Sequence, residues 1–433
     1  MKNTNSDFGN SSSTRRDEVR EKPSPEILIV SQYFPPETGA AASRMGDLAK
    51  YLNQNGFKVN VLTEIPNYPH GKFSKGYNLR WCISEKWNNI LVKRVFVIPT
   101  KRKTFFQRLV YFGSFFFSSL IVGLRLQKMD YVIATSPPPL VGITGWILSR
   151  RYRAKYVLDI RDLWPMAVVE LSDLKSSLVI NLLKYVERFL YDKSDLTTIA
   201  VPGFRKYINQ NDSKSVRIWD FPNGVNSYFL ESNPKHTNLP ELENLDGKFI
   251  VLFSGNHGLA YDLEMILGAA LQLKKNPDIH FLFVGEGISK PDIELIANNN
   301  SLPNVTFVTS QPRESMPSII HRAQVCLLPL KKVPYLKKAL PSSMFEYLAC
   351  KKPIIVTIEG EAEKVLLEAN AGLIIESGNI FELIDAIIFL FEHKNKRKAM
   401  GENGYRFVRN HYNQSHILEG FCNALRAIPR IDP

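Results

Sequence analysis

Cysteine is scarce in this sequence. Only four cysteines occur among 433 residues, at positions 82, 326, 350 and 422, without a Cys-x-x-Cys pair or a histidine at metal-ligand spacing. This scatter argues against a disulfide framework, and we expect no metal site. The first 25 residues also lack the apolar run of a secretory signal. We therefore expect a protein of the reducing cytoplasm.

Glycine and proline, at 24 and 26 residues, are too few for a fibrous or low-complexity chain. Hydrophobic residues make up 44% of the sequence and charged residues 22%, which is typical of a globular protein. The length is roughly three times that of a typical domain, so at least two domains are expected. Residues 1–25 are rich in Asn, Ser, Thr and Arg and are predicted to form a disordered tail.

Acidic residues are depleted in one half of the chain. Residues 1–226 contain 33 Lys and Arg against 19 Asp and Glu, a balance of +14, whereas residues 227–433 contain 22 against 23, a balance of −1. A basic half indicates an anionic partner, either a membrane surface or a nucleic acid. The chain has no recognisable nucleic-acid-binding module, and its aromatic residues do not alternate with Lys and Arg. We therefore expect an anionic membrane surface and no nucleic acid.

Apolar strands alternate with helical stretches from residue 26 onward. In the first half, strands at 27–30 and 58–62 flank an amphipathic helix, a β-α-β unit that requires a parallel sheet. The second half repeats this pattern, with strands predicted at 250–253, 281–284, 305–308, 325–328 and 354–357. The alternation predicts an α/β protein with two Rossmann-like domains that face a cleft. The expected divisions are a first domain at 26–226, a second domain at 227–410, and a helical segment at 411–433 that could cross back over the first domain.

An uncharged run of sixteen residues lies at 109–124. It is short for a transmembrane helix, which needs about 20 apolar residues. Because basic residues flank the run and aromatic residues crowd it, we expect a helix that lies on a bilayer or partly in it; a buried core helix is the alternative. The residues expected at the membrane are Phe105, Phe106, Arg108, Tyr111, Phe112, Phe115, Phe116 and Phe117.

Two glycine-containing turns follow predicted strands of the second half. The sequence FSGNHG at 253–258 ends one strand, and GEG at 285–287 ends the next. Open α/β sheets bind ligands at the carboxyl ends of their strands, and backbone amides beside glycine can approach a phosphate closely. Tight turns without a ligand would need the same glycines, so both interpretations stay open.

A third feature is the sequence PSSMFEYLA at 341–349. Ser342 or Ser343 can cap a helix here, which leaves Glu346 in the first turn. A carboxylate at this place can accept hydrogen bonds from the two hydroxyls of a ribose. A glutamate in the first turn is also an ordinary capping residue, which is the alternative.

Taken together, these motifs resemble family 4 of the retaining GT-B glycosyltransferases. The resemblance extends over about residues 26–410 and is greatest to bacterial enzymes that build lipid-linked cell-surface polysaccharides. The motifs that carry it occur in the expected order. They are ILIVSQYFPPETGAAASRMGDLAKYL, NYPHGK, DIRDLWP, FPNGVN, FSGNHGLAYDLEMI, FVGEG and PSSMFEYLACKKPIIVTIEGEAEKVL.

The resemblance implies a role for individual residues. Glu346 matches the glutamate that binds the nucleotide ribose, Gly39 matches a flexible loop facing donor and acceptor, and Asp162 lies where relatives place polar residues near the reacting sugar. The other residues implied in binding the donor nucleotide are Gly255, Asn256, Gly258, Gly285, Glu286, Gly287, Ser342 and Ser343.

The chain departs from the family pattern at two positions. Many members have a second glutamate eight positions before the ribose-binding one, where this chain has Lys338, and close relatives have a lysine in place of Ser343. A cation for the phosphates is therefore missing from its usual place. The candidates to supply it are His257, Lys331 and Lys338.

The resemblance implies transfer of a sugar, with retention, from a nucleotide donor, expected to be UDP-linked, to a polyprenyl-diphosphate-linked saccharide. This reaction would occur on the inner face of the cytoplasmic membrane. No cofactor is expected, and the sequence lacks an Asp-x-Asp motif at a strand end. Two alternatives stay open: a UDP-sugar 2-epimerase, which shares the two-domain architecture, and a non-catalytic partner in a polysaccharide assembly complex.

Overall fold

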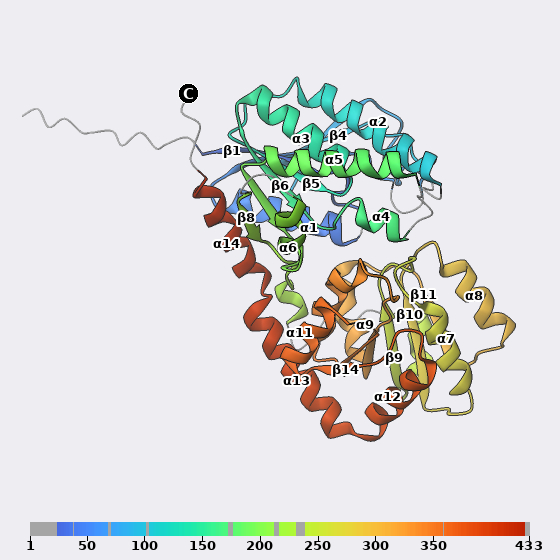
Figure 1. The fold of residues 1–433 in the computed structure, drawn as a ribbon. Helices are drawn as coiled ribbons and strands as arrows, with labels where there is room; N and C mark the ends of the chain where they lie inside the picture. Colours follow the sequence, from blue (N-terminus) through green and yellow to red (C-terminus); the bar gives the residue numbers. More distant parts are fainter. Residues whose placement is uncertain are drawn as a thin grey trace, which may run out of the picture.

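The computed structural model describes residues 24–37, 39–67, 71–100, 104–171, 176–211, 216–230, 239–357 and 359–428. The tail expected at 1–25 lies almost entirely outside these ranges. The chain forms two α/β domains, one above the other in Figure 1, each built on its own sheet. The prediction of two Rossmann-like domains is confirmed.

The first domain contains an eight-stranded sheet in the order β3-β4-β2-β1-β5-β6-β7-β8. Every neighbouring pair is parallel except β3 with β4, which is antiparallel. Its strands are β1 (Glu26–Val30), β2 (Lys58–Glu64), β3 (Cys82–Trp87), β4 (Ile90–Val95), β5 (Tyr131–Ser136), β6 (Lys155–Ile160), β7 (Leu196–Ile199) and β8 (Ile218–Asp220). Its helices are α1 (Ala40–Gln54), α2 (Phe105–Gly123), α3 (Pro139–Tyr152), α4 (Met166–Leu171), α5 (Ser177–Lys193) and α6 (Phe204–Asn211).

The second domain contains a six-stranded parallel sheet in the order β11-β10-β9-β12-β13-β14. Its strands are β9 (Phe249–Ser254), β10 (Ile279–Val284), β11 (Val305–Val308), β12 (Val325–Leu328), β13 (Ile354–Val356) and β14 (Gly372–Ile374). Its α-helices are α7 (Leu263–Gln272), α8 (Lys290–Asn299), α9 (Met316–Arg322), α10 (Ser342–Ala349), α11 (Glu361–Ala369), α12 (Ile380–Glu392) and α13 (Lys394–His411). The short 3-10 helices are η1 (Ser227–Phe229), η2 (Pro240–Leu245), η3 (Arg313–Ser315) and η4 (Leu336–Lys338).

Both faces of the first sheet are covered by helices, which explains its continuous apolar strands. In β1, Ile27 and Ile29 pack on the side of α1, whereas Leu28 and Val30 pack on the side of α2, α3 and α5. Successive side chains of a strand point to opposite faces, so all four are buried. The run Ile-Leu-Ile-Val therefore fits a central parallel strand.

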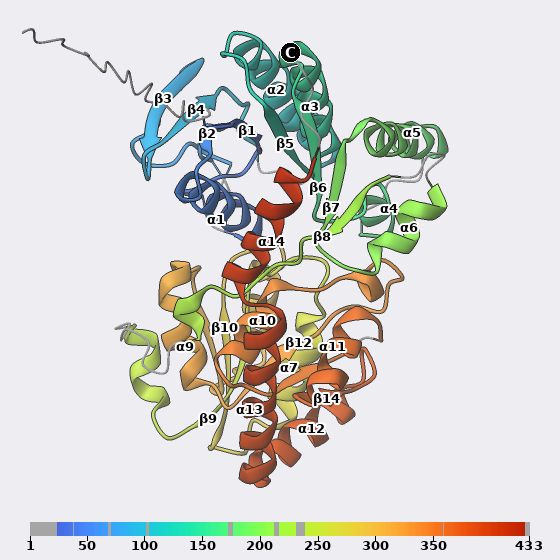
Figure 2. The same ribbon diagram turned by 90° about the vertical axis from the view of Figure 1, so that its left-hand side faces the viewer.

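The final helix, α14 (Gln414–Arg426), crosses back to the first domain, as the sequence suggested (Figure 2). Its apolar side, including Phe421 and Leu425, is buried in the core on the α1 side of the first sheet. The ring of Phe421 lies 4.6 Å from that of Phe221. A Cβ atom on Gly224 would lie 2.7 Å from the Cα of Gln414. The segment that connects the domains therefore requires glycine at the point where it passes the start of α14.

The apolar run predicted at 109–124 forms most of α2. This helix is long and apolar enough to cross a membrane by length and composition, and one third of its most apolar window is buried inside the protein. Tyr111 and Phe115 face the sheet and are fully buried, and the Tyr111 hydroxyl donates a hydrogen bond to Glu64. Their predicted contact with a membrane is therefore wrong, because the run supplies both the inner and the outer side of one helix.

For the residues on the outer side of α2, contact with a membrane stays a prediction. Phe106 and Phe117 are exposed, whereas Phe112, Phe116 and Arg108 are half-buried. The side chain of Phe105 lies outside the described residues. The exposure of these residues differs because a helix buries only the side that faces its neighbours. Packing, and not the composition of the run, decides which side of α2 that is.

Candidate active site

The two glycine turns of the second domain lie against each other at the carboxyl ends of β9 and β10. A Cβ atom on Gly285 would lie 1.9 Å from the carbonyl oxygen of Gly255, and one on Gly287 would lie 2.3 Å from that of His257. Gly285 and Gly255 also have φ angles of 144° and 140°, which L-residues rarely adopt. The glycines are therefore needed for the packing of the two turns, whether or not a ligand is bound.

Several backbone amides that the sequence suggested for phosphate binding instead donate hydrogen bonds within these two turns. The amide of Gly255 donates to the Val284 carbonyl, that of His257 to the Glu286 carbonyl, and that of Gly258 to the Asn256 carbonyl. Within the described part of the chain, the amides of Asn256, Glu286 and Gly287 have no partner. These three amides, rather than the whole first turn, are available to an anion.

His257 is fully buried beside the rings of Phe253 and Phe283. Burial lowers the pKa of His257 to about 4, and Lys290 acts in the same direction. The imidazole is therefore neutral at pH 7. His257 is not the phosphate cation that the sequence suggested, because an apolar site disfavours the charged ring.

The buried imidazole of His257 should make stability depend on pH. In the unfolded chain the imidazole binds a proton near pH 6.5, whereas in the folded protein it does so near pH 4. The unfolded state binds more protons between these values, so the free energy of unfolding falls as the pH falls through this range, by at most about 3 kcal/mol. We expect a His257→Leu variant to lose this part of the dependence in urea unfolding from pH 7 to 4. Identical pH profiles for the two proteins would contradict this assignment.

Glu346 lies in α10 and faces the other domain. Its Oε1 accepts a hydrogen bond from Nε of Arg313 at 3.1 Å and forms an ion pair with Nη2 of the same residue at 3.0 Å. Its side chain is 14% exposed, and Oε2 has no partner among the described residues. Burial raises the pKa of the Glu346 carboxyl, and the Arg313 guanidinium opposes this shift. One carboxylate oxygen is thus fixed and the other is open to a hydroxyl donor.

Arg313 is a cation that sequence reasoning missed. It belongs to η3, on the connection between β11 and α9, and besides Glu346 it approaches Asp47 of α1, with Nη1 and Oδ2 3.6 Å apart. The Asp47 carboxylate in turn accepts a hydrogen bond from Gln414 at 2.7 Å. This chain of polar contacts links both domains and α14. Arg313 follows a parallel strand, at the edge of the sheet where open α/β sheets bind ligands. This is the sequence feature that could have identified it.

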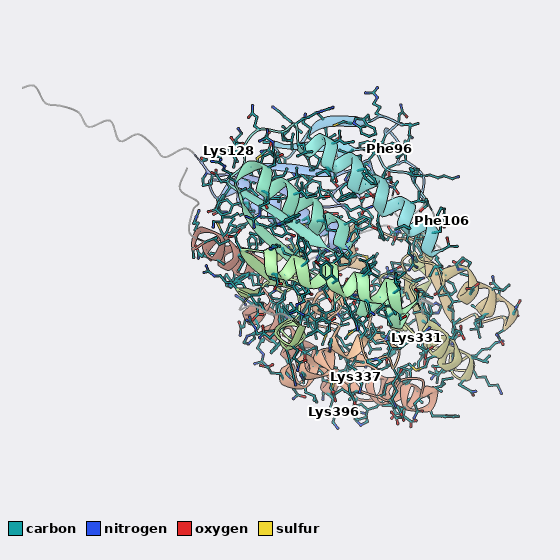
Figure 3. The ribbon with its side chains drawn as sticks, turned by 45° about the horizontal axis from the view of Figure 1, so that its top comes forward. Phe96, Phe106, Lys128, Lys331, Lys337 and Lys396 are labelled. Atoms are coloured by element: carbon teal, nitrogen blue, oxygen red, sulfur yellow. The ribbon has the colours of Figure 1, made fainter. Side chains whose placement is uncertain are left out.

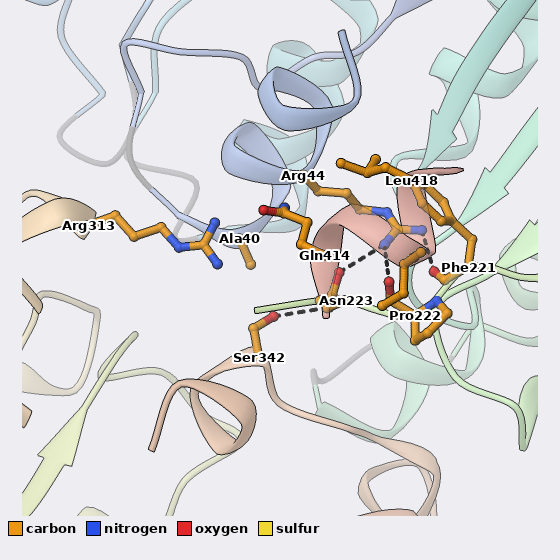
Figure 4. A pocket seen from close by; sticks show the side chains of 11 residues that line it. Ala40, Arg44, Phe221, Pro222, Asn223, Arg313, Ser342, Gln414 and Leu418 are labelled. Atoms are coloured by element: carbon orange, nitrogen blue, oxygen red, sulfur yellow. Dashed lines mark hydrogen bonds between the residues drawn. The ribbon is translucent and has the colours of Figure 1, made fainter. Parts of the chain in front are cut away.

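A small pocket lies between the domains beside this chain of contacts (Figure 4). The Oγ of Ser342 accepts a hydrogen bond from the Asn223 side chain at 3.0 Å, and Asn223 also accepts one from Arg44 at 3.0 Å. The prediction that Ser342 or Ser343 caps this helix and leaves Glu346 in its first turn is wrong: Pro341 occupies the capping position, Ser342 is already the first helical residue, and Glu346 lies beyond the first turn. Ser343 is half-buried.

Arg44 connects the first sheet to the segment that joins the domains. Its guanidinium donates to both carboxylate oxygens of Asp159, at 3.0 and 2.8 Å, and to the carbonyl of Phe221 at 2.6 Å. The side chains of Arg44 and Asp159 are 6% and 1% exposed. A buried, bidentate pair of this kind fixes the position of the connecting segment.

Gly39 directly precedes α1 at the same edge of the cleft. It occupies the capping position with φ 116°, and its carbonyl accepts the amide of Ser43. The next residue, Ala40, lines the pocket that also contains Arg313 and Ser342. The structure thus brings the Gly39 turn close to the α10 side of the second domain.

Asp162 faces the second domain across the cleft. Its Oδ1 accepts a hydrogen bond from the Tyr335 hydroxyl at 2.8 Å. Burial raises the pKa of the Asp162 carboxyl, while Arg161 and this hydrogen bond lower it. Arg161 is held in place by the Thr135 hydroxyl at 2.6 Å and by the carbonyl of Pro137. The carboxylate is thus positioned by groups from both domains.

A second carboxylate, Glu187 of α5, lines a pocket together with Asp162. It accepts hydrogen bonds from the hydroxyls of Tyr191, at 2.8 Å, and Tyr207, at 3.1 Å. Burial raises the pKa of Glu187 to about 7. Sequence reasoning missed this residue, because a glutamate in an amphipathic helix carries no motif that distinguishes it from a surface glutamate.

The two lysine candidates lie apart from each other. Lys331 is exposed, on the connection that follows β12. Lys338 points to the first domain, where its Nζ lies 5.0 Å from the centre of the Tyr207 ring and 4.0 Å from the sulfur of Met166. In this conformation Arg313 is nearer than either lysine to the proposed ribose carboxylate, since it contacts Glu346 directly.

Across the described ranges, no three His, Cys, Asp or Glu side chains form a group that could hold a metal ion. The polar groups that meet at the cleft are carboxylates, hydroxyls, an arginine and backbone amides. This set can bind a ribose and a diphosphate and can stabilise charge that develops between them.

Comparison with known proteins gives matches over both domains. The family described as Glycosyl transferases group 1 matches residues 235–407, and the Glycosyl transferase 4-like domain matches residues 39–224. The putative colanic acid biosynthesis glycosyl transferase WcaI of Escherichia coli is 26% identical over 421 residues, which are 93% of this chain and 100% of that protein. The probable glycosyltransferase WbjE of Pseudomonas aeruginosa is 26% identical over 60% of this chain and 66% of its own length.

Solved structures share the two-domain fold. Sucrose-phosphate synthase from Thermosynechococcus elongatus has a TM-score of 0.73 at 18% identity, covering 93% of this chain and 98% of its own. HepE from Anabaena, in complex with UDP-glucose, has a TM-score of 0.68 at 15% identity, covering 93% of this chain and 99% of its own. The resemblance inferred from the sequence motifs is confirmed, and the chain belongs to family 4 of the GT-B glycosyltransferases.

Proposed function

We propose that this glycosyltransferase moves a sugar, with retention of configuration, from a UDP-sugar to a polyprenyl-diphosphate-linked saccharide during surface polysaccharide biosynthesis. The similarity to WcaI, which is named for colanic acid biosynthesis, supports the polysaccharide pathway. HepE, a structural neighbour, is described in complex with UDP-glucose, which supports a UDP-linked donor. The peripheral, cytoplasmic location is part of the same proposal.

The observation that carries the proposal is the position of Glu346. Its carboxylate lies at the interface of the domains, fixed through one oxygen by Arg313 and open at the other. In the proposed complex the open oxygen, Oε2, accepts hydrogen bonds from the ribose of the donor. The amides of Asn256, Glu286 and Gly287 would then bind the diphosphate, assisted by the partial positive charge of nearby helix N-termini.

The reaction itself requires departure of UDP from the anomeric carbon. Negative charge develops on the phosphate and positive charge on the sugar, so preorganised donors at the phosphate give most of the stabilisation. In the proposed mechanism the leaving phosphate oxygen takes the proton of the acceptor hydroxyl as the new glycosidic bond forms on the same face. This chain then needs no separate general base.

Asp162 is proposed to stabilise the positive charge on the sugar. An Asp162→Asn variant keeps an oxygen that accepts the Tyr335 hydrogen bond and removes the negative charge. We expect its turnover to fall about 100-fold, the usual cost of losing one electrostatic contact to a transition state. The dissociation constant of UDP, measured by calorimetry, should stay within about twofold. An unchanged turnover number would exclude this role.

The function is tested with purified protein, labelled UDP-sugars and lipid-linked acceptors extracted from a strain that lacks the gene. Transfer of label to the lipid fraction, and its loss in Glu346→Gln, would support the proposal. Formation of an epimerised UDP-sugar without acceptor would instead identify a UDP-sugar 2-epimerase. Normal polymer synthesis in cells that carry Glu346→Gln at the normal protein level would identify a non-catalytic partner.

A further inference from the structure

The first domain exposes an apolar surface on α5 that the sequence analysis did not single out. Leu178, Leu182 and Tyr185 are 75%, 57% and 69% exposed. Their spacing of four and then three residues places them in one row along the helix. The opposite side of α5 holds it to the domain through buried Glu187, Leu190 and Tyr191, so this row is not needed for packing.

The row on α5 lies on the same side of the sheet as the outer side of α2 (Figure 1). Both helices pack against α3, which lies between them on the same face of the sheet (Figure 1). The outer side of α2 contributes Phe106 and Phe117, which are 71% and 63% exposed. Between the helices, Trp146 of α3 is half-buried, with its ring 4.8 Å from that of Phe189 of α5. We define the α2–α5 face by its exposed apolar residues Phe106, Leu109, Phe117, Ile121, Leu178, Leu182 and Tyr185.

The exposed charged residues of α2, α3 and α5 themselves are basic. None of the exposed residues in the described parts of α2, α3 and α5 is acidic. Phe106 and Lys128 lie toward opposite ends of the face (Figure 3). The exposed cations of α3 and α5 are Arg150, Arg151, Lys184 and Arg188; in the segments that follow α2 and α3, Arg125, Lys128 and Arg153 are exposed, as is one acidic residue, Asp130.

We propose that the α2–α5 face is a docking surface for an anionic lipid leaflet, with α5 as a second membrane-contacting helix beside α2. An amphipathic helix binds such an interface when its apolar side enters the headgroup region and its cations meet anionic lipids. A symmetric dimer through this face would instead bring the cations of two copies together, which costs free energy. The combination of apolar rows and cations therefore fits lipid better than a second copy of this chain.

Docking through α5 has a consequence for the site. The helix that presents Leu178 and Leu182 outward also contributes Glu187, Leu190 and Tyr191 to the pocket that contains Asp162. A leaflet in contact with α5 would thus lie beside the acceptor side of the cleft. The identity of the lipid-linked acceptor rests on the proposed function, whereas docking to the leaflet is a separate binding event that needs no donor.

The test is flotation of the full-length protein with vesicles of phosphatidylcholine, with and without phosphatidylglycerol. We expect the protein to bind the anionic vesicles and to be released by salt. A Leu178→Glu/Leu182→Glu variant should bind about tenfold more weakly, because two anions replace inserted side chains. The matched control is Leu295→Glu/Leu367→Glu, which introduces the same charges at exposed positions of the second domain and should bind like the unmodified protein.

Weaker vesicle binding could also result from misfolding, so a second variant is designed to bind vesicles more tightly. Gly113 lies on the outer side of α2, and a Cβ atom there would have no atom within 4 Å. Gly113→Leu should therefore bind anionic vesicles several-fold more tightly, since it adds apolar area without a clash. The melting temperature of each variant shows whether it is folded.

Three results would overturn the docking proposal. The first is equal vesicle binding by Leu178→Glu/Leu182→Glu and the control variant. The second is no binding of the unmodified protein to anionic vesicles. The third is a dimer in solution that these substitutions dissociate without any change in vesicle binding. Transfer activity on a water-soluble acceptor analogue is measured in parallel, so that failure of docking and failure of the proposed function are distinguished.

Discussion

Replacing Asp159 with alanine is expected to lower the free energy of unfolding by about 4 kcal/mol, because it leaves a buried arginine without its counter-ion. Arg44 and Asp159 form two hydrogen bonds, and both side chains are almost fully buried. The Thr198 hydroxyl, which donates to Asp159 at 2.8 Å, would lose its acceptor as well. Urea unfolding followed by tryptophan fluorescence measures the change.

The control for Asp159→Ala is Asp220→Ala in the same domain. Asp220 pairs with Arg205 at 2.9 Å, and both side chains are more than 40% exposed. An exposed pair contributes little, so we expect a change of no more than about 1 kcal/mol. If the two variants were equally stable, the buried pair would have no special role in holding the domain together.

Replacing Glu346 with glutamine is expected to raise the dissociation constant of UDP about 30-fold, which corresponds to about 2 kcal/mol for hydrogen bonds to a charged acceptor. Glutamine keeps the size of the side chain but removes the charge that would accept from the ribose. It also weakens the contact that fixes Arg313. Transfer activity should fall with donor binding. Isothermal titration calorimetry with UDP gives the dissociation constant directly.

Glu402→Gln is the matched control for Glu346→Gln. Glu402 of α13 pairs with Lys351 at 2.9 Å on the exposed surface of the second domain. The same chemical change there should leave the dissociation constant of UDP unchanged. If Glu346→Gln and Glu402→Gln bound UDP equally well, the donor nucleotide would have to lie elsewhere.

The fold could be predicted largely from the pattern of apolar residues. Strands buried on both faces, such as 281–284 within β10, stand out as uninterrupted apolar runs, and parallel pairing follows from the helices between them. The side of α2 that faces the sheet could not be predicted. Its aromatic residues surround the helix, and only the packing partner decides that Tyr111 is buried while Phe117 is exposed.

The candidate site was predictable where a motif marks it and not where packing creates it. Glu346 and Asp162 were found in recognisable motifs, and the structure places both at the interface of the domains. Arg313 and Glu187 belong to no motif and reach the site through contacts between distant segments. His257 was one of the candidates for the missing phosphate cation, but its burial, which the sequence does not reveal, keeps it neutral.

The crossing of α14 means that the first domain is completed last during synthesis. Phe421 and Leu425 fill the core beside β1, yet the ribosome makes them about 200 residues after β8 has emerged. At about 5 to 20 residues per second, this interval lasts roughly 10 to 40 s. Throughout it, the α1 side of the first sheet exposes the apolar surface that α14 later covers, so we expect the nascent chain to be prone to aggregation until α14 has been translated.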